Sequence, residues 1–235
     1  MQILQVGLSH KTAPIEVREH LALSEADLPA ALKMLCPASG CGGALEGAIL
    51  STCNRLEVYA VVGDAEQGQR HIGECLSRAS SVSPTVFAPH LQVRRNEAAV
   101  AHLCEVACGL DSMIVGEPQI QGQVAQAHQL ALCHDVAGTA INALFRTALR
   151  AGKRARTETG IARHAVSISY AAVELASQIF DDLACKSVLL VGAGEMSELA
   201  ARNLVDHGVH KLVVVNRSLS RATALAQQFN NKALE

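Results

Sequence analysis

The chain has 235 residues, of which 49% are hydrophobic and 18% are charged, and its net charge is −2. This composition provides apolar material for one or two globular domains, and the near-neutral charge argues against an indiscriminate nucleic-acid binder. There is no run of eighteen apolar residues and no signal-peptide pattern at the start, so we expect a cytoplasmic protein without a membrane span.

The first 95 residues predict strands and helices in the order βαββαβ, the ferredoxin-like split unit of an α+β sandwich. Alternating β-branched residues indicate the strands, and Ser24 with Asp27 is typical of a helix start. The expected strands cover residues 3–9, 48–53, 56–62 and 86–94, and the expected helices cover residues 24–35 and 66–80.

Helices dominate the next sixty residues. Asn96 is suited to cap a helix that stops at Gly109, and Pro118 is suited to begin a second helix that ends near His134. A third helix is expected over residues 139–157. The segment 157–164 interrupts the pattern, so we place a domain boundary between residues 158 and 159.

The remaining residues predict the beginning of an α/β domain of the Rossmann type. The expected order is helix 165–180, strand 187–191, helix 195–207, strand 211–216 and helix 218–229. Because two parallel strands cannot cover their own faces, we expect this second domain to be truncated.

A glycine-rich loop follows the first strand of that domain. It comprises Gly192, Ala193, Gly194, Glu195, Met196 and Ser197. Glycines let backbone N–H groups approach a pyrophosphate at a helix N-terminus, so the loop predicts dinucleotide binding. The second strand ends at Asn216, Arg217 and Ser218, where an arginine in place of the usual acid favours NADP. A structural turn and a solvated arginine are the alternatives.

Eight cysteines occur in the chain, with no CxxC pair and no zinc-finger spacing, so we expect reduced thiols and no structural metal site. Cys53 stands out because it lies at the end of a predicted strand, shortly before the next one, where side chains can face a cleft. In an extended backbone Arg55 would lie beside it, favouring the thiolate nucleophile and offering a fork for a substrate carboxylate. A buried, inert cysteine is the alternative.

Other polar residues have ordinary explanations when each is considered alone. His102 in an Ala-rich helix is typical of a packed or surface histidine, and Ser112 of a loop serine. Gln119 and Gln123 share one helix face, as in a solvated stripe.

Basic residues are concentrated between Arg146 and Arg163, where Glu158 is the single acid. Arg146, Arg150 and Arg154 recur every four residues and form a helix face suited to phosphate contacts, although such faces are usually only solvated. With 3% aromatic residues and no tryptophan, the chain offers no platform for stacking on single-stranded nucleic acid.

Five groups of motifs, in this order, resemble the glutamyl-tRNA reductase family over essentially the whole chain. They are Gly7-Leu-Ser-His-Lys-Thr-Ala-Pro14 with Arg18-Glu19; Ser51-Thr-Cys-Asn-Arg55 with Glu57; Gly109-Leu-Asp-Ser112 with Gly116-Glu-Pro-Gln119 and Gly122-Gln123; Lys153 to Gly160; and Gly192 to Ser197. No single string is specific, but five in register are.

The resemblance implies NADPH-dependent reduction of the glutamyl group of Glu-tRNA(Glu) to glutamate-1-semialdehyde for tetrapyrrole synthesis. Cys53 would be the nucleophile that forms a thioester and releases tRNA, and His102 would be important for activity, with an acid/base role as a hypothesis. Implied substrate contacts are Thr52, Asn54, Arg55, Ser112, Glu117, Pro118, Gln119 and Gln123.

The resemblance also implies a homodimer and transfer of the labile aldehyde to an aminomutase. It divides the chain into a catalytic domain, residues 1–158, and a truncated NADPH-binding domain, residues 159–235. The resemblance implies a further helical dimerisation domain, which we do not expect within these 235 residues. We therefore expect weak or absent reductase activity, with acylation of Cys53 retained.

Two other functions fit parts of the sequence. Shikimate-dehydrogenase-like NADP-dependent carbonyl reductases share the glycine loop and an Asn-Arg-Ser/Thr signature, but such an enzyme would leave Cys53 without a role. A non-catalytic tRNA-binding module would use the basic face from Arg146 to Arg156.

Overall fold

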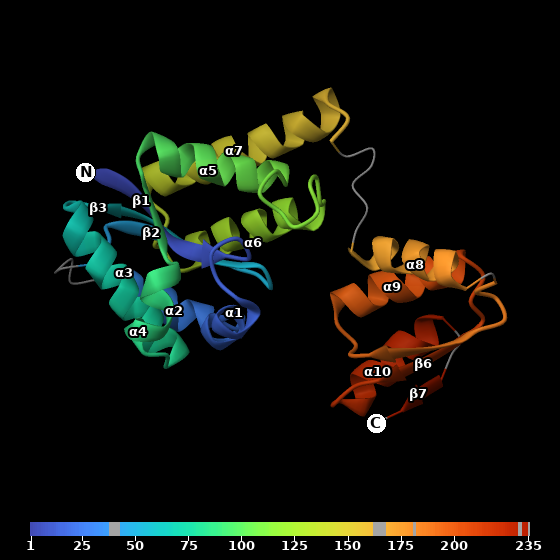
Figure 1. Ribbon diagram of the computed structural model, residues 1–235. Coiled ribbons are helices and arrows are strands. Elements are labelled where there is room, and N and C mark those ends of the chain that lie inside the picture. Colours follow the sequence, from blue (N-terminus) through green and yellow to red (C-terminus); the bar gives the residue numbers. More distant parts are fainter. Residues whose placement is uncertain (38–42, 162–167, 181, 230–231, 235) are drawn as a thin grey trace. The chain divides into compact units, whose positions relative to one another are not determined.

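The computed structural model describes residues 1–235 except 38–42, 162–167, 181, 230–231 and 235 (Figure 1). The chain forms two compact units, Met1–Ala165 and Val166–Glu235. The expected domain boundary at residue 158 stays a prediction, and Cys41 and the expected helix start at Ala165 lie outside the described residues. Within the described part of the chain, every helix is too short or too polar to cross a membrane.

The first unit is built on one antiparallel sheet in the strand order β2-β3-β1-β4. Its strands are β1 (Gln2–Ser9), β2 (Glu46–Ser51), β3 (Arg55–Val62) and β4 (Gln92–Arg95). β1 pairs with β3 along its whole length, from Gln2 opposite Val62 to Ser9 opposite Arg55. Every residue of the central strand β3 is buried, so the sheet is covered on both faces.

Helices form a layer on each face of this sheet (Figure 1). One layer contains α1 (Ile15–Leu21), α2 (Leu28–Leu35), α3 (Ala65–Ser80), α4 (Pro84–Phe87) and a 3-10 turn, η1 (Ala88–His90). The other contains α5 (Glu97–Cys108), α6 (Gln119–Cys133) and α7 (Thr139–Glu158).

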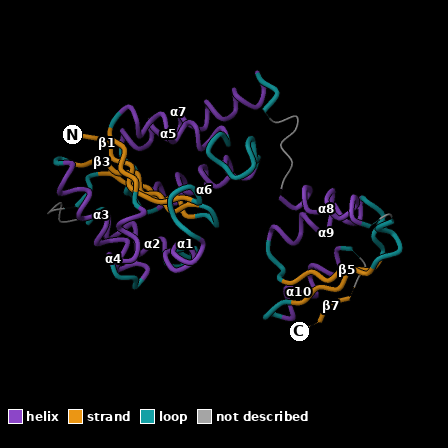
Figure 2. Tube along the Cα trace, in the orientation of Figure 1, coloured by secondary structure: helices purple, strands orange, loops and turns teal. Residues whose placement is uncertain are grey.

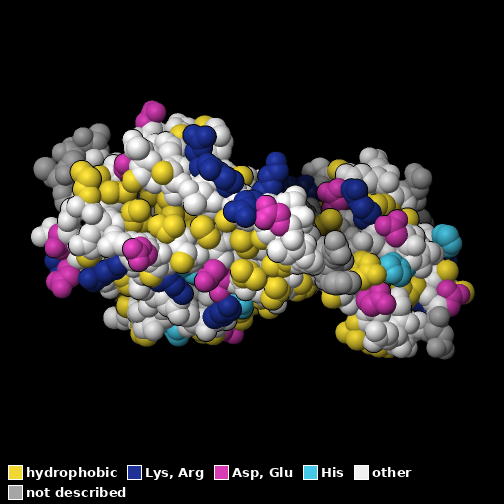
Figure 3. Space-filling view, turned by 90° about the horizontal axis from the view of Figure 1, so that it is seen from above, with side chains coloured by type: hydrophobic (Ala, Val, Ile, Leu, Met, Phe, Trp, Pro, Cys, Tyr) yellow, Lys and Arg dark blue, Asp and Glu magenta, His cyan; other side chains and the backbone are white. Residues whose placement is uncertain are grey.

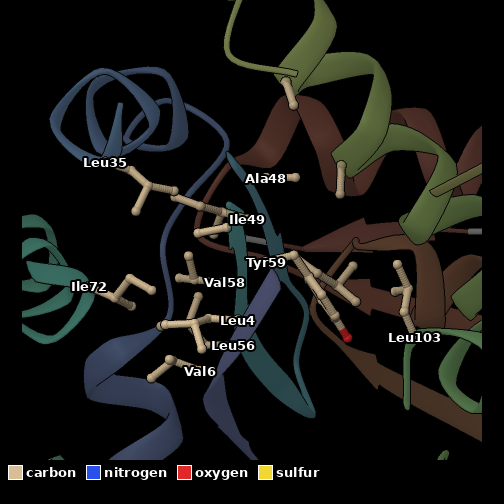
Figure 4. Close-up of a cluster of buried hydrophobic side chains, with 14 of the residues drawn as sticks. Leu4, Val6, Leu35, Ala48, Ile49, Leu56, Val58, Tyr59, Ile72 and Leu103 are labelled. Atoms are coloured by element: carbon tan, nitrogen blue, oxygen red, sulfur yellow. The ribbon is translucent and has the colours of Figure 1, made fainter. Parts of the chain in front are cut away.

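The alternation of side chains along the strands distributes the core between the two layers. Leu4 and Val58 point towards Ile72 of α3, whereas Tyr59 lies on the side of Leu103 of α5 (Figure 4). The period of two follows from the pleat of a β-strand. Residues 55, 57 and 59 therefore share the face covered by α5, α6 and α7.

Several elements of this unit differ from the expectation. The helix expected from residue 24 begins at Leu28, and the strand expected to end at residue 53 ends at Ser51. The expected strand 86–94 is wrong in its first half, because α4 and η1 occupy residues 84–90 and β4 begins at Gln92. Pro84 fits the first turn of a helix, and Pro89 has no N–H to give to a ladder. Helix α1, which begins directly after Pro14, was not predicted; it has a single buried residue, Leu21, and therefore a weak apolar pattern.

The second unit has a parallel sheet in the order β5-β6-β7, with helices between the strands (Figure 2). Its elements are α8 (Ile168–Ile179), β5 (Ser187–Val191), α9 (Glu195–Asp206), β6 (Lys211–Val215), α10 (Leu219–Gln228) and β7 (Lys232–Leu234). The expectation of two strands is wrong, because β7 adds a third. The chain is thus a mixed α/β protein with an antiparallel first unit and a parallel second one.

Candidate active site

Cys53 lies in a tight three-residue connection between β2 and β3 and is exposed. The Thr52 amide donates to the carbonyl of Arg55 (2.8 Å), which closes the turn. The hydroxyl oxygen of Thr52 accepts hydrogen bonds from the amides of Asn54 and Arg55, both at 3.1 Å. The backbone of the turn is therefore fixed by its own residues, and the thiol is presented at its tip.

A pocket opens beside this turn. The turn contributes Thr52, Cys53, Asn54 and Arg55, and the loop after α5 with the first half of α6 contributes Ser112, Glu117, Ile120 and Gln123. Seven of the ten residues predicted for the catalytic and substrate site thus meet in one place. Ile120 was not predicted, although it lies three residues before Gln123 and so shares its helix face.

The cation that contacts the Cys53 turn is Arg18. Its guanidinium donates to the carbonyl of Cys53 (2.8 Å) and to the side-chain oxygen of Asn54 (3.3 Å). The sequence placed Arg18 in a motif but gave it no role. Burial and then the nearby Glu117 carboxylate raise the pKa of the Cys53 thiol, while a backbone hydrogen bond and Arg18 act in the opposite direction.

Arg55 does not pair with the thiol, because the turn breaks the extended geometry on which that expectation rested. Its guanidinium is buried and donates to the carboxylates of Glu57 (2.9 Å) and Asp111 (2.9 Å) and to the carbonyl of Asp111 (2.6 Å). Arg55 borders the pocket, but these contacts already occupy two of its nitrogens. Its Nε has no partner among the described residues.

Glu57 is the centre of a buried polar network beneath the pocket. It accepts hydrogen bonds from Arg55 and from the hydroxyl of Tyr59 (2.7 Å), and its Oε1 lies 2.9 Å from Nε2 of His102. Burial alone would raise the pKa of Glu57, but the bond from His102 and the charge of Arg55 lower it overall. A carboxylate is retained in the core because its oxygens have partners.

His102 belongs to this network and does not line the pocket. Glu57, His102 and Asp111 each place one possible metal-ligand atom within 4.8 Å of the others. The guanidinium of Arg55 already binds both of these carboxylates, so the positive charge that a metal would provide is present. We therefore interpret the cluster as an ion-pair network.

The loop between α5 and α6 is tied to the sheet by Asp111. This residue pairs with Arg55 and also with Lys11 (2.5 Å). Burial would raise the pKa of Asp111, but these two cations lower it overall. The tie positions the neighbouring Ser112, which is buried, against the Cys53 turn.

Arg156 of α7 fixes both ends of the same loop. Its guanidinium donates to the carbonyl of Ala107 at the end of α5 (2.9 Å) and to that of Glu117 before α6 (3.0 Å). Gly152, one turn earlier, allows this close approach, since a Cβ there would lie 2.5 Å from the carbonyl of Ala107. One arginine thus holds together the three helices behind the pocket.

Pro118 and Gln119 do not line the pocket. Pro118 caps the start of α6 and is exposed, and Gln119 is the first residue of that helix. Their predicted substrate contacts stay predictions.

In the second unit the structure brings the two predicted nucleotide loops together. The loop after β5 begins with Gly192, whose φ of +105° favours glycine, and Gly194 caps α9. The amide of Gly192 donates to the carbonyl of Val215 (2.7 Å), next to Asn216, so both loops leave the same edge of the sheet. Arg217 is exposed there.

The other loop residues have local roles. Ser197 faces Gly192, with its hydroxyl 3.6 Å from where a Cβ would be. Asn216 donates to the carbonyl of Ser218 (3.1 Å), which caps α10. Ala193 packs against the hydrophobic cluster that contains the buried residues of α10. The carbonyl of Met196 accepts a hydrogen bond from the Ser169 hydroxyl. The side chain of Glu195 is not among those that the structure describes.

Comparison with known families assigns the two units separately. Residues 6–159 match the family described as glutamyl-tRNAGlu reductase, N-terminal domain, and residues 174–235 match the family of shikimate/quinate 5-dehydrogenase. The second match is confined to the second unit and covers the two loops that the sequence predicts to bind a nucleotide. The residues of the Cys53 pocket lie within the range matched by the first family.

Known proteins of similar sequence match almost the whole chain. Glutamyl-tRNA reductase of Geobacillus kaustophilus is 51% identical over 99% of this chain and 51% of its own length, and that of Syntrophotalea carbinolica is 47% identical over 100% and 52%. The solved structure of glutamyl-tRNA reductase from Methanopyrus kandleri is similar with a TM-score of 0.62 and 37% identity, over 99% of this chain and 53% of that one. The chain thus spans about half the length of the relatives it matches.

Proposed function

Because this chain belongs to the glutamyl-tRNA reductase family, we propose that it serves the NADPH-dependent reduction of the glutamyl group of Glu-tRNA(Glu) to glutamate-1-semialdehyde, the first step of the C5 pathway to 5-aminolevulinate and tetrapyrroles. The observation that carries this proposal is the exposed thiol of Cys53 on a fixed turn beside a polar pocket.

The first chemical step is acyl transfer to Cys53. The sulfur attacks the carbonyl carbon of the ester that joins glutamate to the tRNA; a C–S bond forms, the C–O bond breaks, and the thiol proton ends on the ribose oxygen of the released tRNA. The fixed turn reduces the entropy that the nucleophile loses in reaching the attack geometry. A thioester then remains on the enzyme.

The pocket residues are proposed as substrate contacts. Thr52, Asn54, Ser112 and Gln123 offer hydroxyl and amide groups to the glutamyl moiety, and Arg55 and Glu117 border the same space. Pro118 and Gln119 remain in the proposal as substrate contacts, although neither lines the pocket. His102 acts as a positioning residue, because it holds Glu57, which in turn holds Arg55.

The second unit is proposed to hold NADPH. Gly192 and Gly194 allow close backbone approach to a pyrophosphate at the start of α9, and the exposed Arg217 on the adjacent loop suits a 2′-phosphate. The bound cofactor would supply the hydride that converts the thioester to the aldehyde and returns Cys53 as the thiolate.

Finer features follow from the same assignment. The strand order and antiparallel pairing of the first unit support a ferredoxin-like arrangement with added helices, and we place the catalytic domain at residues 1–158 and the NADPH domain at 159–235. We further propose a cytoplasmic homodimer in the longer relatives, with delivery of the aldehyde to an aminomutase.

Transfer of labelled glutamate from Glu-tRNA to the protein, without NADPH, tests the acyl-transfer step. Wild type and Cys133→Ser, which changes another exposed cysteine of the first unit, are expected to acquire label, and Cys53→Ser none. A full-length relative serves as a reference for activity. Label on Cys53→Ser, or none on the wild type of the full-length relative, would exclude the thioester mechanism.

A further inference from the structure

One face of α7 carries exposed basic side chains away from the core. Arg146, Arg150 and Lys153 are exposed, whereas Phe145 and Ala148 are fully buried. Positions 146, 150 and 153 recur at i, i+4 and i+7, so they follow one line along the helix. We call these three residues the α7 stripe; Figure 3 shows dark-blue side chains gathered over this helix.

The structure separates the stripe from the other basic residues of α7. Arg154 pairs with Glu158 through two hydrogen bonds of 3.0 Å, and Arg156 is directed inward to backbone carbonyls. Among the described residues, no acid lies within ion-pair distance of the three side chains of the stripe. Their charges are therefore available to an external anion.

α7 also packs directly behind the wall of the Cys53 pocket. Arg156 donates to the carbonyl of Glu117, a pocket residue, and the side-chain amide of Gln121 in α6 donates to the carbonyl of Leu149 (3.2 Å). Leu149 precedes Arg150 of the stripe. If the end of a polymer enters the pocket, the rest of the polymer must lie across a surface beside the pocket. The stripe belongs to α7, which is one of the helices around the pocket.

We propose that the α7 stripe binds phosphates of the tRNA whose aminoacyl end enters the Cys53 pocket. This inference rests on the proposed function and adds the place where the body of the tRNA is held. The three cations are separated along the helix axis by roughly 6 Å and roughly 4.5 Å, at about 1.5 Å per residue, so they can meet successive backbone phosphates. Such contacts provide affinity and orientation without reading bases, which agrees with the absence of tryptophan and the few aromatic residues.

The salt dependence of tRNA binding provides the test. The dissociation constant of this chain for Glu-tRNA(Glu) would be measured by fluorescence anisotropy from 50 to 200 mM NaCl, a range chosen from the usual response of phosphate contacts. The variant carries Arg146→Gln, Arg150→Gln and Lys153→Gln. The slope of log K against log salt is expected to fall in magnitude by about 2 to 3, with at least tenfold weaker binding at the lowest salt.

A matched control removes the same charges from the opposite helical layer. Lys33→Gln, Arg70→Gln and Arg78→Gln change two arginines and one lysine that are exposed on α2 and α3. We expect this control to keep the wild-type slope. Equal losses in both triple variants would mean that only net charge matters, and an unchanged slope in the stripe variant would also overturn the proposal.

Two further readouts separate the proposals. The stripe variant is expected to keep the wild-type rate of Cys53 alkylation by iodoacetamide, which reports a folded pocket. Label transfer to Cys53 together with stripe-independent tRNA binding would overturn the stripe and leave the proposed function standing. No tRNA binding by the wild type at 50 mM salt would overturn the stripe, and no binding by the full-length relative as well would overturn both proposals. Stripe-dependent binding to phosphatidylserine vesicles, with tRNA binding unaffected, would assign the surface to membranes instead.

Discussion

The two units hold their functional groups in opposite ways. In the first unit, β3 is buried along its whole length and still carries Arg55 and Glu57, so its polar groups are fixed by partners inside the core. In the second unit, β5 alternates between exposed and half-buried residues, with Leu189 59% and Val191 79% exposed, and its loops display backbone groups at the sheet edge.

The difference shows two routes to a preorganised site. The Cys53 pocket rests on a charge network in which Arg55 is held by both Glu57 and Asp111. The nucleotide loops depend on backbone conformation, chiefly the positive φ of Gly192, and on the start of α9. Changes that affect charge should therefore act strongly on the first unit and weakly on the second.

The largest expected effect comes from Glu57→Leu. The variant leaves Arg55 buried with fewer partners, and we expect the free energy of unfolding of the first unit to fall by about 3–5 kcal/mol. Hydrogen exchange measured by mass spectrometry should show lost protection in β1 and β3 and unchanged protection in β5 and α9. Equal losses of protection in both units would contradict the contrast between them, because the stabilities of the two units would then be coupled. Glu158→Gln, at an exposed pair, is the control and should leave the free energy of unfolding nearly unchanged.

The second largest effect is expected from acid, which should lower the stability of the first unit more than that of the second. The pKa values of Glu57 and Asp111 are lowered in the folded state, so the stability they contribute is present above the ordinary carboxyl range and is lost as pH falls below it. Between pH ~5 and pH ~3 we expect the first unit to lose up to about 1.4 kcal/mol per pH unit for each group. Denaturant unfolding across this range measures the slope, which Glu57→Leu should flatten. A wild-type slope no steeper than that of Glu57→Leu would contradict the role of this carboxylate.

A smaller effect concerns the thiol. Glu117→Gln removes a charge that raises the pKa of Cys53, so alkylation of Cys53 by iodoacetamide at neutral pH should accelerate. Arg18→Gln should slow it. The alkylation of Cys133, followed in the same digest, is the internal control. Slower reaction in Glu117→Gln would mean that the carboxylate assists the thiol by accepting its proton.

The smallest effect is expected at the exposed face of β5. Leu189→Thr should change the free energy of unfolding of the second unit by less than about 0.5 kcal/mol, because the side chain is already largely in water. Hydrogen exchange of the α9 amides, monitored as the denaturant concentration rises, measures this change in the free energy of unfolding. A loss above about 1 kcal/mol would show that this face is covered in solution, and the contrast between the units would be weaker than described.

The motifs of the family resemblance grouped residues that the structure brings to one pocket. Thr52, Cys53 and Asn54 line it together with Ser112, Glu117 and Gln123, and their roles in binding and catalysis stay predictions. The neighbours of Arg55 were not predictable in the same way. Its partner Asp111 is 56 residues away, and a three-residue turn reversed the geometry that an extended chain would have given.

The fold shows the same division. Strands with regular alternation, such as β1 and β3, were predicted almost to their ends, whereas the short helices α1 and α4 were not. Arg156 illustrates the limit for side chains. In the sequence it belongs to a basic run, and only the close approach of α5 and α7 at Gly152 turns it inward to Ala107 and Glu117.

The two anchors of the loop between α5 and α6 have a consequence for access to the pocket. Leu110, Met113 and Val115 in this loop are more than half exposed, a composition that by itself would suggest a flap. Lifting it, however, would separate Asp111 from Arg55 and strip Arg156 of its acceptor at Glu117. Such an opening is a sub-global event and not a nanosecond fluctuation. Ligands should therefore enter and leave the pocket on the side where Cys53 is exposed to solvent. The rate of ligand entry should be insensitive to the stiffness of this loop.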